Sequence, residues 1–205
     1  MLPVPPALLI TDRSQAKGDL AAVVAAACAG GCRWISLREK DLPEVEQVAL
    51  FARIAGVARP FGARVTLHGA AALARAAGAD GVHLPGGSDA AAARALLGPK
   101  ALVGLSLHSR EEAAQTDAAS LDYVTASPVF LTASKPGYGP ALGLEGLAAF
   151  ARACPVPVLA LGGVGAAEAG ACWAAGAAGL AVMGGVMRAD DPATAFRAVA
   201  GPFKI

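Results

Sequence analysis

The sequence predicts an α/β fold in which eight parallel strands, each followed by a helix, close into a (β/α)8 TIM barrel. Short apolar runs alternate with longer alanine-rich runs along all 205 residues, and one motif that precedes a strand recurs half a chain apart. Continuous apolar strands separated by helices indicate a parallel sheet whose outer face is covered. Eight such units are the number that closes a barrel.

The apolar pattern places strands and helices in strict alternation. We expect strands over residues 7–11, 34–37, 64–67, 81–84, 102–106, 123–126, 158–161 and 180–183. The helices are expected over residues 19–29, 44–58, 70–77, 89–97, 110–119, 144–153, 166–175 and 192–199. No linker or change of composition divides the chain, so residues 1–205 are expected to form a single barrel domain.

A repeated motif favours a barrel over an open sheet. Residues 77–84 (AGADGVHL) are similar to residues 175–182 (AGAAGLAV), and residues 29–35 (AGGCRWI) are a weaker copy. Each copy places a glycine at the end of a helix, just before a strand. A repeat of paired units is typical of a barrel, with a flavodoxin-like or Rossmann sheet as the alternative.

The composition argues against several classes of protein. Lys and Arg number 17 against 16 Asp and Glu, which predicts binding neither to nucleic acid nor to an anionic membrane. The amino-terminal residues lack the features of a signal peptide, and no apolar run is long enough to span a membrane. We therefore expect a cytoplasmic protein.

Four cysteines without metal-ligand spacing are expected to be buried, reduced thiols: Cys28, Cys32, Cys154 and Cys172.

Polar side chains follow the strands, at the end where a barrel carries its active site. Arg38 and Lys40 flank Glu39 after the second strand, so on extended chain they point the same way. Two cations on one face suit an anion such as diphosphate or carboxylate, and a solvated charge run is the alternative. Further donors follow the fifth and sixth strands: Ser106, Thr132, Ser134 and Lys135. The loop over residues 132–140 has the length and hinges of a lid.

Two glycine pairs follow the seventh and eighth strands: Gly162 with Gly163, and Gly184 with Gly185. Barrels often bind phosphate at this place through backbone N–H groups, and a Cβ would block the close approach of the anion. These glycines therefore predict a phosphate site, with simple tight turns as the alternative.

The three histidines and Asp89 allow more than one interpretation. His83 is interpreted as a structural residue of the barrel, as is His108, and His68 is the stronger candidate for a catalytic base. Asp89 is either the N-cap of the fourth helix or a Mg²⁺ ligand. No carboxylate pair suggests a general acid and base, and no His/Asp cluster suggests a transition-metal site.

Seven segments, in order along nearly the whole chain, resemble the thiamine-phosphate synthase/TenI family. They are residues 9–13 (LITDR), 37–41 (LREKD), 78–84 (GADGVHL), 104–109 (GLSLHS), 127–130 (SPVF), 161–164 (LGGV) and 189–192 (ADDP). The family fold is a (β/α)8 barrel. The resemblance implies a transferase of thiamine biosynthesis that joins hydroxymethylpyrimidine diphosphate to thiazole phosphate, with Mg²⁺ helping diphosphate to leave.

The resemblance also assigns residues to the two substrates. Those at the diphosphate positions are Arg38, Lys40, Ser106, Thr132, Ser134 and Lys135, and those at the thiazole phosphate positions are Gly162, Gly163, Gly184 and Gly185. The sequence departs from the usual synthase pattern at three places. Ser36 replaces the usual Gln, and His68-Gly69 replaces the usual Asn-Asp. Asp89 lies one position late, so one of the two Mg²⁺ ligands is missing and the other is displaced.

These departures leave more than one function open. The altered segments are similar to the TenI branch, which includes a thiazole tautomerase that moves a proton on thiazole carboxylate phosphate without Mg²⁺. The tautomerase's catalytic histidine aligns with Pro128 here. The alternatives are thus a synthase, a tautomerase-like enzyme using His68 or another base, a non-catalytic thiazole-phosphate binder and an unrelated phosphate-binding barrel enzyme. A homo-oligomer is compatible with each.

Overall fold

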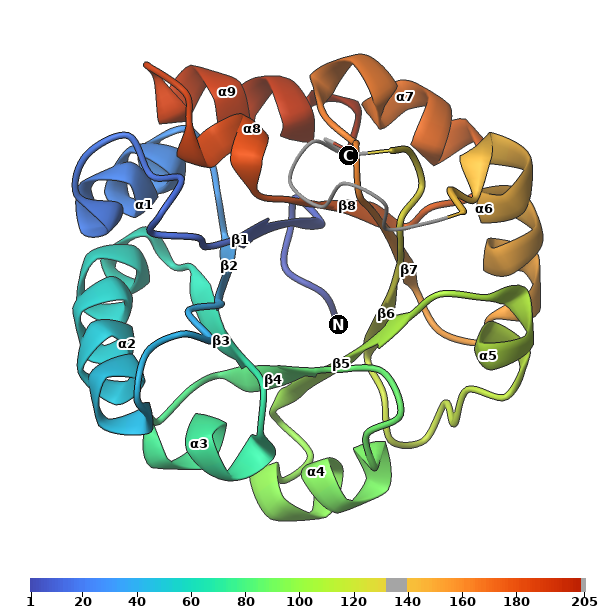
Figure 1. Ribbon diagram of the computed structural model, residues 1–205, viewed down its shortest axis with the longest axis horizontal. Coiled ribbons are helices and arrows are strands. Elements are labelled where there is room, and N and C mark those ends of the chain that lie inside the picture. The colour runs from blue at the N-terminus through green and yellow to red at the C-terminus, as the bar shows by residue number, and fades with distance from the viewer. Residues whose placement is uncertain (132–139, 204–205) are drawn as a thin grey trace.

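A computed structural model describes residues 1–131 and 140–203, and these residues form a closed barrel (Figure 1). Eight parallel strands are paired in the order β1 to β8, and β8 pairs with β1 to close the ring. The helices form a layer around the outside of the strands (Figure 1). The predicted (β/α)8 barrel is confirmed, and the open-sheet alternative is wrong.

The elements follow the expected alternation closely. The strands are β1 (Ala7–Ile10), β2 (Trp34–Leu37), β3 (Arg64–His68), β4 (Gly81–Leu84), β5 (Leu102–Leu107), β6 (Tyr123–Ala126), β7 (Val158–Leu161) and β8 (Gly179–Val182). The helices are α1 (Leu20–Ala29), α2 (Glu44–Ala58), α3 (Ala71–Ala76), α4 (Ala90–Leu97), α5 (Arg110–Ala114), α6 (Gly143–Ala153), α7 (Ala166–Ala174), α8 (Gly184–Met187) and α9 (Pro192–Ala200). Short 3₁₀ turns cover Arg59–Phe61 and Gly201–Phe203.

Apolar side chains pack in two places. The larger cluster fills the space between the strands and the surrounding helices. A smaller cluster fills the inside of the barrel: Leu8, Ile10, Trp34, Leu102, Tyr123, Leu159 and Ala181. The segment before β1 runs to the centre of the ring (Figure 1), and its Leu2 packs against this inner cluster. The barrel is therefore a packed core, and the space for a ligand lies at one end of it.

The repeated motif is a helix-ending turn used three times. In each copy the second residue past the C-cap donates its amide to the carbonyl five residues earlier: Cys32 to Ala27, Ala79 to Ala74, and Ala177 to Cys172. The glycines between have φ angles of 105°, 63° and 94°: Gly31, Gly78 and Gly176. This is the Schellman motif, whose left-handed residue favours glycine. The motif ends α1, α3 and α7 just before a strand.

Two helices differ from the prediction. Helix α5 was expected to reach residue 119, but it ends at Ala114. The cause is Asp117, whose carboxylate accepts hydrogen bonds from the Ala119 amide (2.9 Å) and the Ser120 hydroxyl and so competes with the helix. Helix α8 was not predicted, because two glycines begin it. The Met187 carbonyl at its end accepts a hydrogen bond from the Lys17 amide (2.9 Å), a contact of the tertiary fold.

The cysteines are free thiols, as expected. Cys28, Cys32 and Cys172 are buried, which confirms the prediction for these three, whereas Cys154 is only half-buried.

Within the described residues, no helix has both the length and the apolar character needed to cross a membrane.

Candidate active site

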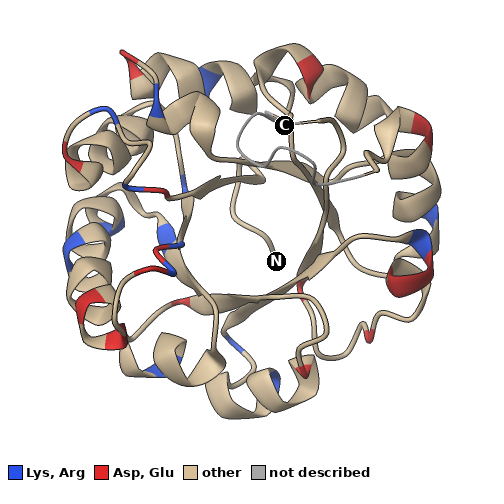
Figure 2. Cartoon of the chain, viewed as in Figure 1, with Lys and Arg blue, Asp and Glu red and all other residues tan. Residues whose placement is uncertain are grey.

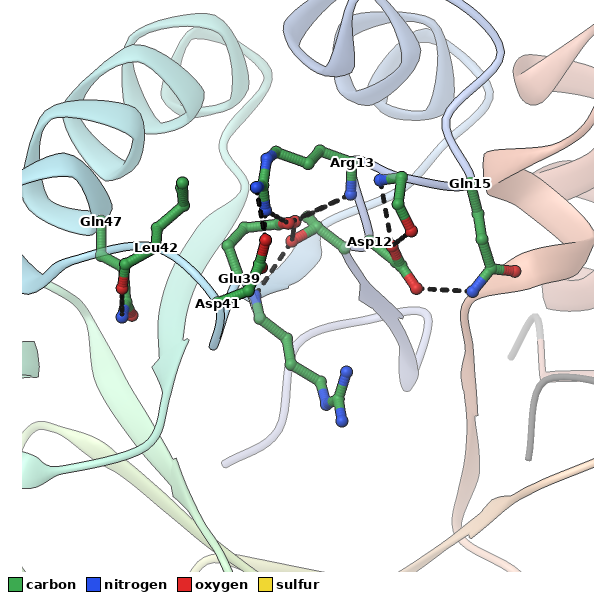
Figure 3. Close-up of polar contacts among 10 residues, drawn as sticks. Asp12, Arg13, Gln15, Glu39, Asp41, Leu42 and Gln47 are labelled. Carbon is green, nitrogen blue, oxygen red and sulfur yellow. Dashed lines mark hydrogen bonds and ion pairs between the residues drawn. The ribbon is translucent and has the colours of Figure 1, made fainter. Parts of the chain in front are cut away.

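The carboxylate of Glu39 is a buried anchor between the ends of β1 and β2. It accepts hydrogen bonds from the Thr11 hydroxyl (2.7 Å), the Arg13 amide (3.1 Å) and the Arg13 guanidinium (3.1 Å), and its residue is only 3% exposed (Figure 3). The Thr11 hydroxyl in turn accepts from the amide of Arg38 (2.9 Å). These bonds hold the chain on both sides of Glu39 in one position.

Arg13 extends this anchor to the surface. Figure 3 shows its guanidinium reaching from Glu39 to Asp41, where it forms two parallel bonds of 2.7 and 2.5 Å. The hydrogen bonds from Arg13 lower the pKa of Asp41. Sequence reasoning missed both Arg13 and Glu39. The available signal was the position of Glu39 between two cations. An acidic residue at such a place can hold the surrounding chain by accepting hydrogen bonds.

Arg38 and Lys40 act on the same point inside the barrel. Figure 2 shows charged residues gathered where β1 and β2 end, inside the ring of helices. Burial, then the positive charges of Lys40 and Arg38, lowers the pKa of His83 to about 3. Both cations are therefore within electrostatic range of the fully buried His83. Among the described residues, none forms a hydrogen bond or ion pair with the Arg38 guanidinium.

His83 joins a polar chain inside the barrel. Its Nδ1 lies 3.0 Å from the Tyr123 hydroxyl oxygen, and its Nε2 lies 2.9 Å from Ser106 Oγ. His83 and Tyr123 are fully buried, whereas Ser106 is half-buried near the end of β5. His83 is thus a buried, hydrogen-bonded residue of the barrel, which agrees with the structural interpretation. Its bond to Ser106 also connects it to a predicted site residue.

Three other predicted residues line one cavity. Lys40, His68 and Asp89 surround a space of about 580 Å³, together with apolar residues such as Leu73 and Leu84. The His68 ring lies 4.9 Å from the His83 ring, measured between centroids. The cavity thus adjoins the end of the barrel where Arg38 and Ser106 lie.

The glycines after β7 pack tightly against the loop that follows β6. Gly162 and Gly163 have φ angles of 93° and 63°. A Cβ on Gly162 would lie 2.9 Å from Pro128 atoms, and one on Gly163 would lie 2.7 Å from the Leu131 carbonyl oxygen. Packing within the chain is therefore enough to require glycine at both positions, whether or not an anion binds there.

The glycines after β8 are different, because one faces open space and the other faces a cation. A Cβ on Gly185 would meet no atom within 4 Å, whereas one on Gly184 would lie 2.3 Å from Arg188 Nη1. The Arg188 guanidinium is held by Gln15, which donates to Asp12 (2.5 Å). The two glycines begin α8, where backbone N–H groups have no partner within the helix. Sequence reasoning missed Arg188.

Thr132, Ser134 and Lys135, and nearly all of the expected lid, lie outside the residues that the structure describes.

Sequence and fold are both similar to known proteins. A family profile described as thiamine monophosphate synthase matches residues 7–186. The chain belongs to this thiamine monophosphate synthase family. It is 40% identical to the thiamine-phosphate synthase of Roseiflexus sp. (strain RS-1), over 93% of this chain and 82% of that protein. It is 39% identical to the thiamine-phosphate synthase of Moorella thermoacetica, over 93% of this chain and 91% of the relative.

A solved structure agrees with these relatives. Thiamine phosphate pyrophosphorylase from Pyrococcus furiosus matches with a TM-score of 0.84 and 28% identity, covering 96% of this chain and 94% of that one. The function is that of a thiamine-phosphate synthase, a transferase of thiamine biosynthesis.

Thiamine-phosphate synthases generally use Mg²⁺. The described residues form no Mg²⁺ site made wholly of protein side chains, so water and substrate phosphates would complete the coordination of the ion. Mg²⁺ requires several oxygen ligands in octahedral geometry. Asp89 uses one oxygen to accept the Ala92 amide (2.9 Å), which confirms the N-cap interpretation. No three His, Cys, Asp or Glu side chains cluster as metal ligands in residues 1–131 and 140–203.

Two substitutions of Asp89 test the cap against the metal. Asp89→Asn is expected to keep the melting temperature, because asparagine caps helices as well as aspartate does. Asp89→Ala is expected to lower the free energy of unfolding by about 0.5–2 kcal/mol, measured by urea denaturation. The Mg²⁺ response of turnover should be unchanged in Asp89→Asn. A loss of that response at unchanged stability would show that the carboxylate binds the metal.

Proposed function

We propose that this thiamine-phosphate synthase joins hydroxymethylpyrimidine diphosphate to thiazole phosphate at the carboxyl ends of its strands. The observation that carries the proposal is the placement of two cations, Arg38 and Lys40, close to the His83 to which the Ser106 hydroxyl bonds. Cations and a hydroxyl at one point suit a diphosphate. The buried Glu39 supports this arrangement, because it holds the backbone between the two cations.

The proposed role of these groups is to stabilise the leaving group. Negative charge builds on the diphosphate oxygens as the bond to the pyrimidine substituent breaks and the two rings are joined. Donors already aimed at that place need no rearrangement as the charge develops, and this lowers the barrier. Arg38, Lys40 and Ser106 fill this role in the proposal, with Lys135, Thr132 and Ser134 as further donors from the sixth loop.

The thiazole phosphate is proposed to bind on the other side of the barrel mouth, after β7 and β8. The first N–H groups of α8, at Gly184 and Gly185, and the neighbouring Arg188 guanidinium support this placement. Gly162 and Gly163 belong to the same proposed site. An anion there would receive backbone hydrogen bonds and the charge of an arginine.

His68 is proposed to contact the pyrimidine ring of the substrate, between the diphosphate-binding groups and the cavity. It lines the cavity beside Lys40, and its ring lies against that of His83. It is therefore suited to contact the pyrimidine ring of a substrate whose diphosphate lies at Arg38. This role needs no acidic neighbour.

The test of the proposed function is a turnover assay. The purified protein is incubated with hydroxymethylpyrimidine diphosphate and thiazole phosphate, with and without Mg²⁺, and thiamine phosphate and diphosphate are measured. We expect the two products in equal amounts. A second arm supplies thiazole carboxylate phosphate alone and follows its isomerisation. Isomerisation without thiamine phosphate formation would contradict the proposal and favour the tautomerase alternative.

A further inference from the structure

We propose that Tyr123 is a positioning residue, which fixes the tautomer of His83 and thereby keeps the Ser106 hydroxyl as a hydrogen-bond donor toward the barrel mouth. The three side chains form one chain across the inside of the barrel. Tyr123 Oη lies 3.0 Å from His83 Nδ1, and His83 Nε2 lies 2.9 Å from Ser106 Oγ. The proposal rests on the diphosphate site proposed above.

Both buried members of this chain are neutral at pH 7. Burial, with the charges of Lys40 and Arg38, lowers the pKa of His83 to about 3. Burial, with the charge of Asp122, raises the pKa of Tyr123 far above its ordinary value. The imidazole therefore carries a single N–H, and its place on Nδ1 or Nε2 depends on its two neighbours.

One of the two tautomers leaves a buried group without a partner. A proton on Nδ1 would point at the Tyr123 oxygen, and the Tyr123 O–H would then have no acceptor. His83 is its one hydrogen-bond partner within the part of the chain that the structure describes. A buried hydroxyl without an acceptor is strongly unfavourable. With the proton on Nε2, Tyr123 donates to Nδ1, and Nε2–H donates to Ser106 Oγ.

The favoured tautomer decides what Ser106 can offer to a ligand. Its oxygen accepts from Nε2–H, so its own O–H is directed elsewhere, at the half-buried end of β5. Thr125 Oγ1 is the alternative acceptor for Nε2–H, but it is farther away, at 3.5 Å. With the other tautomer Ser106 would donate to Nε2 and present lone pairs to the diphosphate, which would repel it. Tyr123 thus makes Ser106 selective for anionic oxygen.

The surroundings hold the Tyr123 ring without its hydroxyl. Its ring packs edge-on against Trp34, with centroids 4.6 Å apart, and stacks on His83 at 5.5 Å with 30° between the ring planes. Gly104 leaves the space for it, because a Cβ there would lie 2.1 Å from Tyr123 Cζ. Tyr123→Phe should therefore keep the ring in place and remove only the donor to His83.

The first measurement locates the proton directly. Nitrogen-15 NMR of histidine-labelled protein at pH 7 distinguishes a protonated from a bare ring nitrogen, and the three histidines are assigned with His68→Gln and His108→Gln variants. We expect His83 to be protonated on Nε2 in the wild-type protein, and this preference to weaken in Tyr123→Phe. A wild-type His83 protonated on Nδ1 would overturn the proposal, whatever the substrate.

The second measurement is a double-mutant cycle on turnover. Tyr123→Phe is expected to lower kcat by about threefold to tenfold, the worth of one hydrogen bond, with little change in KM for thiazole phosphate. In a Ser106→Ala background the same substitution should have no further effect. If the losses of kcat in the two single variants multiplied in the double variant, the proposal would be overturned, because Tyr123 would then act through packing and not through Ser106.

Two controls distinguish a specific role of Tyr123 from a general effect of removing a buried hydroxyl and from a failure of the proposed diphosphate contact. Thr66→Val removes another buried barrel hydroxyl, which bonds to the Ile35 carbonyl at 3.1 Å, and it should leave kcat unchanged in both backgrounds. If Ser106→Ala itself leaves turnover unchanged, the diphosphate contact proposed for Ser106 fails and the catalytic role of Tyr123 fails with it. The NMR result then still decides which tautomer the barrel holds.

Discussion

Replacement of Arg38 by alanine is expected to weaken binding of hydroxymethylpyrimidine diphosphate by about tenfold to a hundredfold and to leave thiazole phosphate binding nearly unchanged. A hydrogen bond to a charged group is worth about 1.5–3 kcal/mol, which corresponds to this range of affinity. The guanidinium forms no bond to the described residues, so its loss should disturb the fold little. Isothermal titration with each ligand in turn measures the two affinities.

Arg188→Ala is the reciprocal variant, because Arg188 lies at the other proposed anion site, beside Gly184. It should weaken thiazole phosphate binding and spare the pyrimidine diphosphate. Arg110→Ala, on the exposed start of α5, controls for the loss of one positive charge. If Arg38→Ala and Arg188→Ala each weakened both ligands equally, the two anions would not have separate sites.

Glu39→Gln is expected to lower the free energy of unfolding by about 2–3 kcal/mol, because hydrogen bonds to its buried carboxylate are charge-assisted. Glutamine keeps the volume but replaces an accepting oxygen with a donor that faces other donors, from Thr11 and Arg13. In a protein of this size the melting temperature should fall by about 4–12 °C, measured by calorimetry. The KM for the pyrimidine diphosphate should also rise, because Arg38 and Lys40 flank the residue.

Asp41→Asn is the matched control for Glu39→Gln, because Arg13 bonds to both carboxylates. The Asp41 side chain is 68% exposed, so its ion pair with Arg13 is largely solvated. Exposed ion pairs contribute little to stability because solvent screens them, so the melting temperature should change little. Equal destabilisation by the two substitutions would show that the anchor depends on the charge of Arg13 and not on the burial of Glu39.

The fold could be predicted from the sequence because its determinants are local. Apolar runs of strand length alternating with helical runs place most elements within a few residues of their observed bounds, as at Trp34–Leu37 and Glu44–Ala58. The glycine motif was found from its three copies, and Gly78 and Gly176 do end helices before strands. Because all strands of a barrel are parallel, their carboxyl ends meet at one mouth. The sequence therefore also indicated the end of the barrel at which the proposed site lies.

Asp89 and the glycine pairs show where local reasoning ends. The sequence allowed Asp89 to be a cap or a metal ligand, and the 2.9 Å bond to the Ala92 amide establishes the cap. It allowed Gly162 and Gly163 to serve phosphate binding or tight turns. The structure adds a third reason, the close approach of the loop after β6. These distinctions depend on what lies beside a residue in space, and composition and spacing do not report it.

By itself the sequence determined the barrel, the order of its elements and the mouth that carries Arg38, Lys40 and Ser106. Only the tertiary structure decided which side chains hold these residues in place. Glu39 bonds to residues 26 and 28 positions away, and His83 to Tyr123 40 positions away. Such contacts follow from the register of neighbouring strands and from loops meeting at the mouth. Short-range periodicity sets which face a residue occupies, whereas the closure of the barrel sets which residue it meets there.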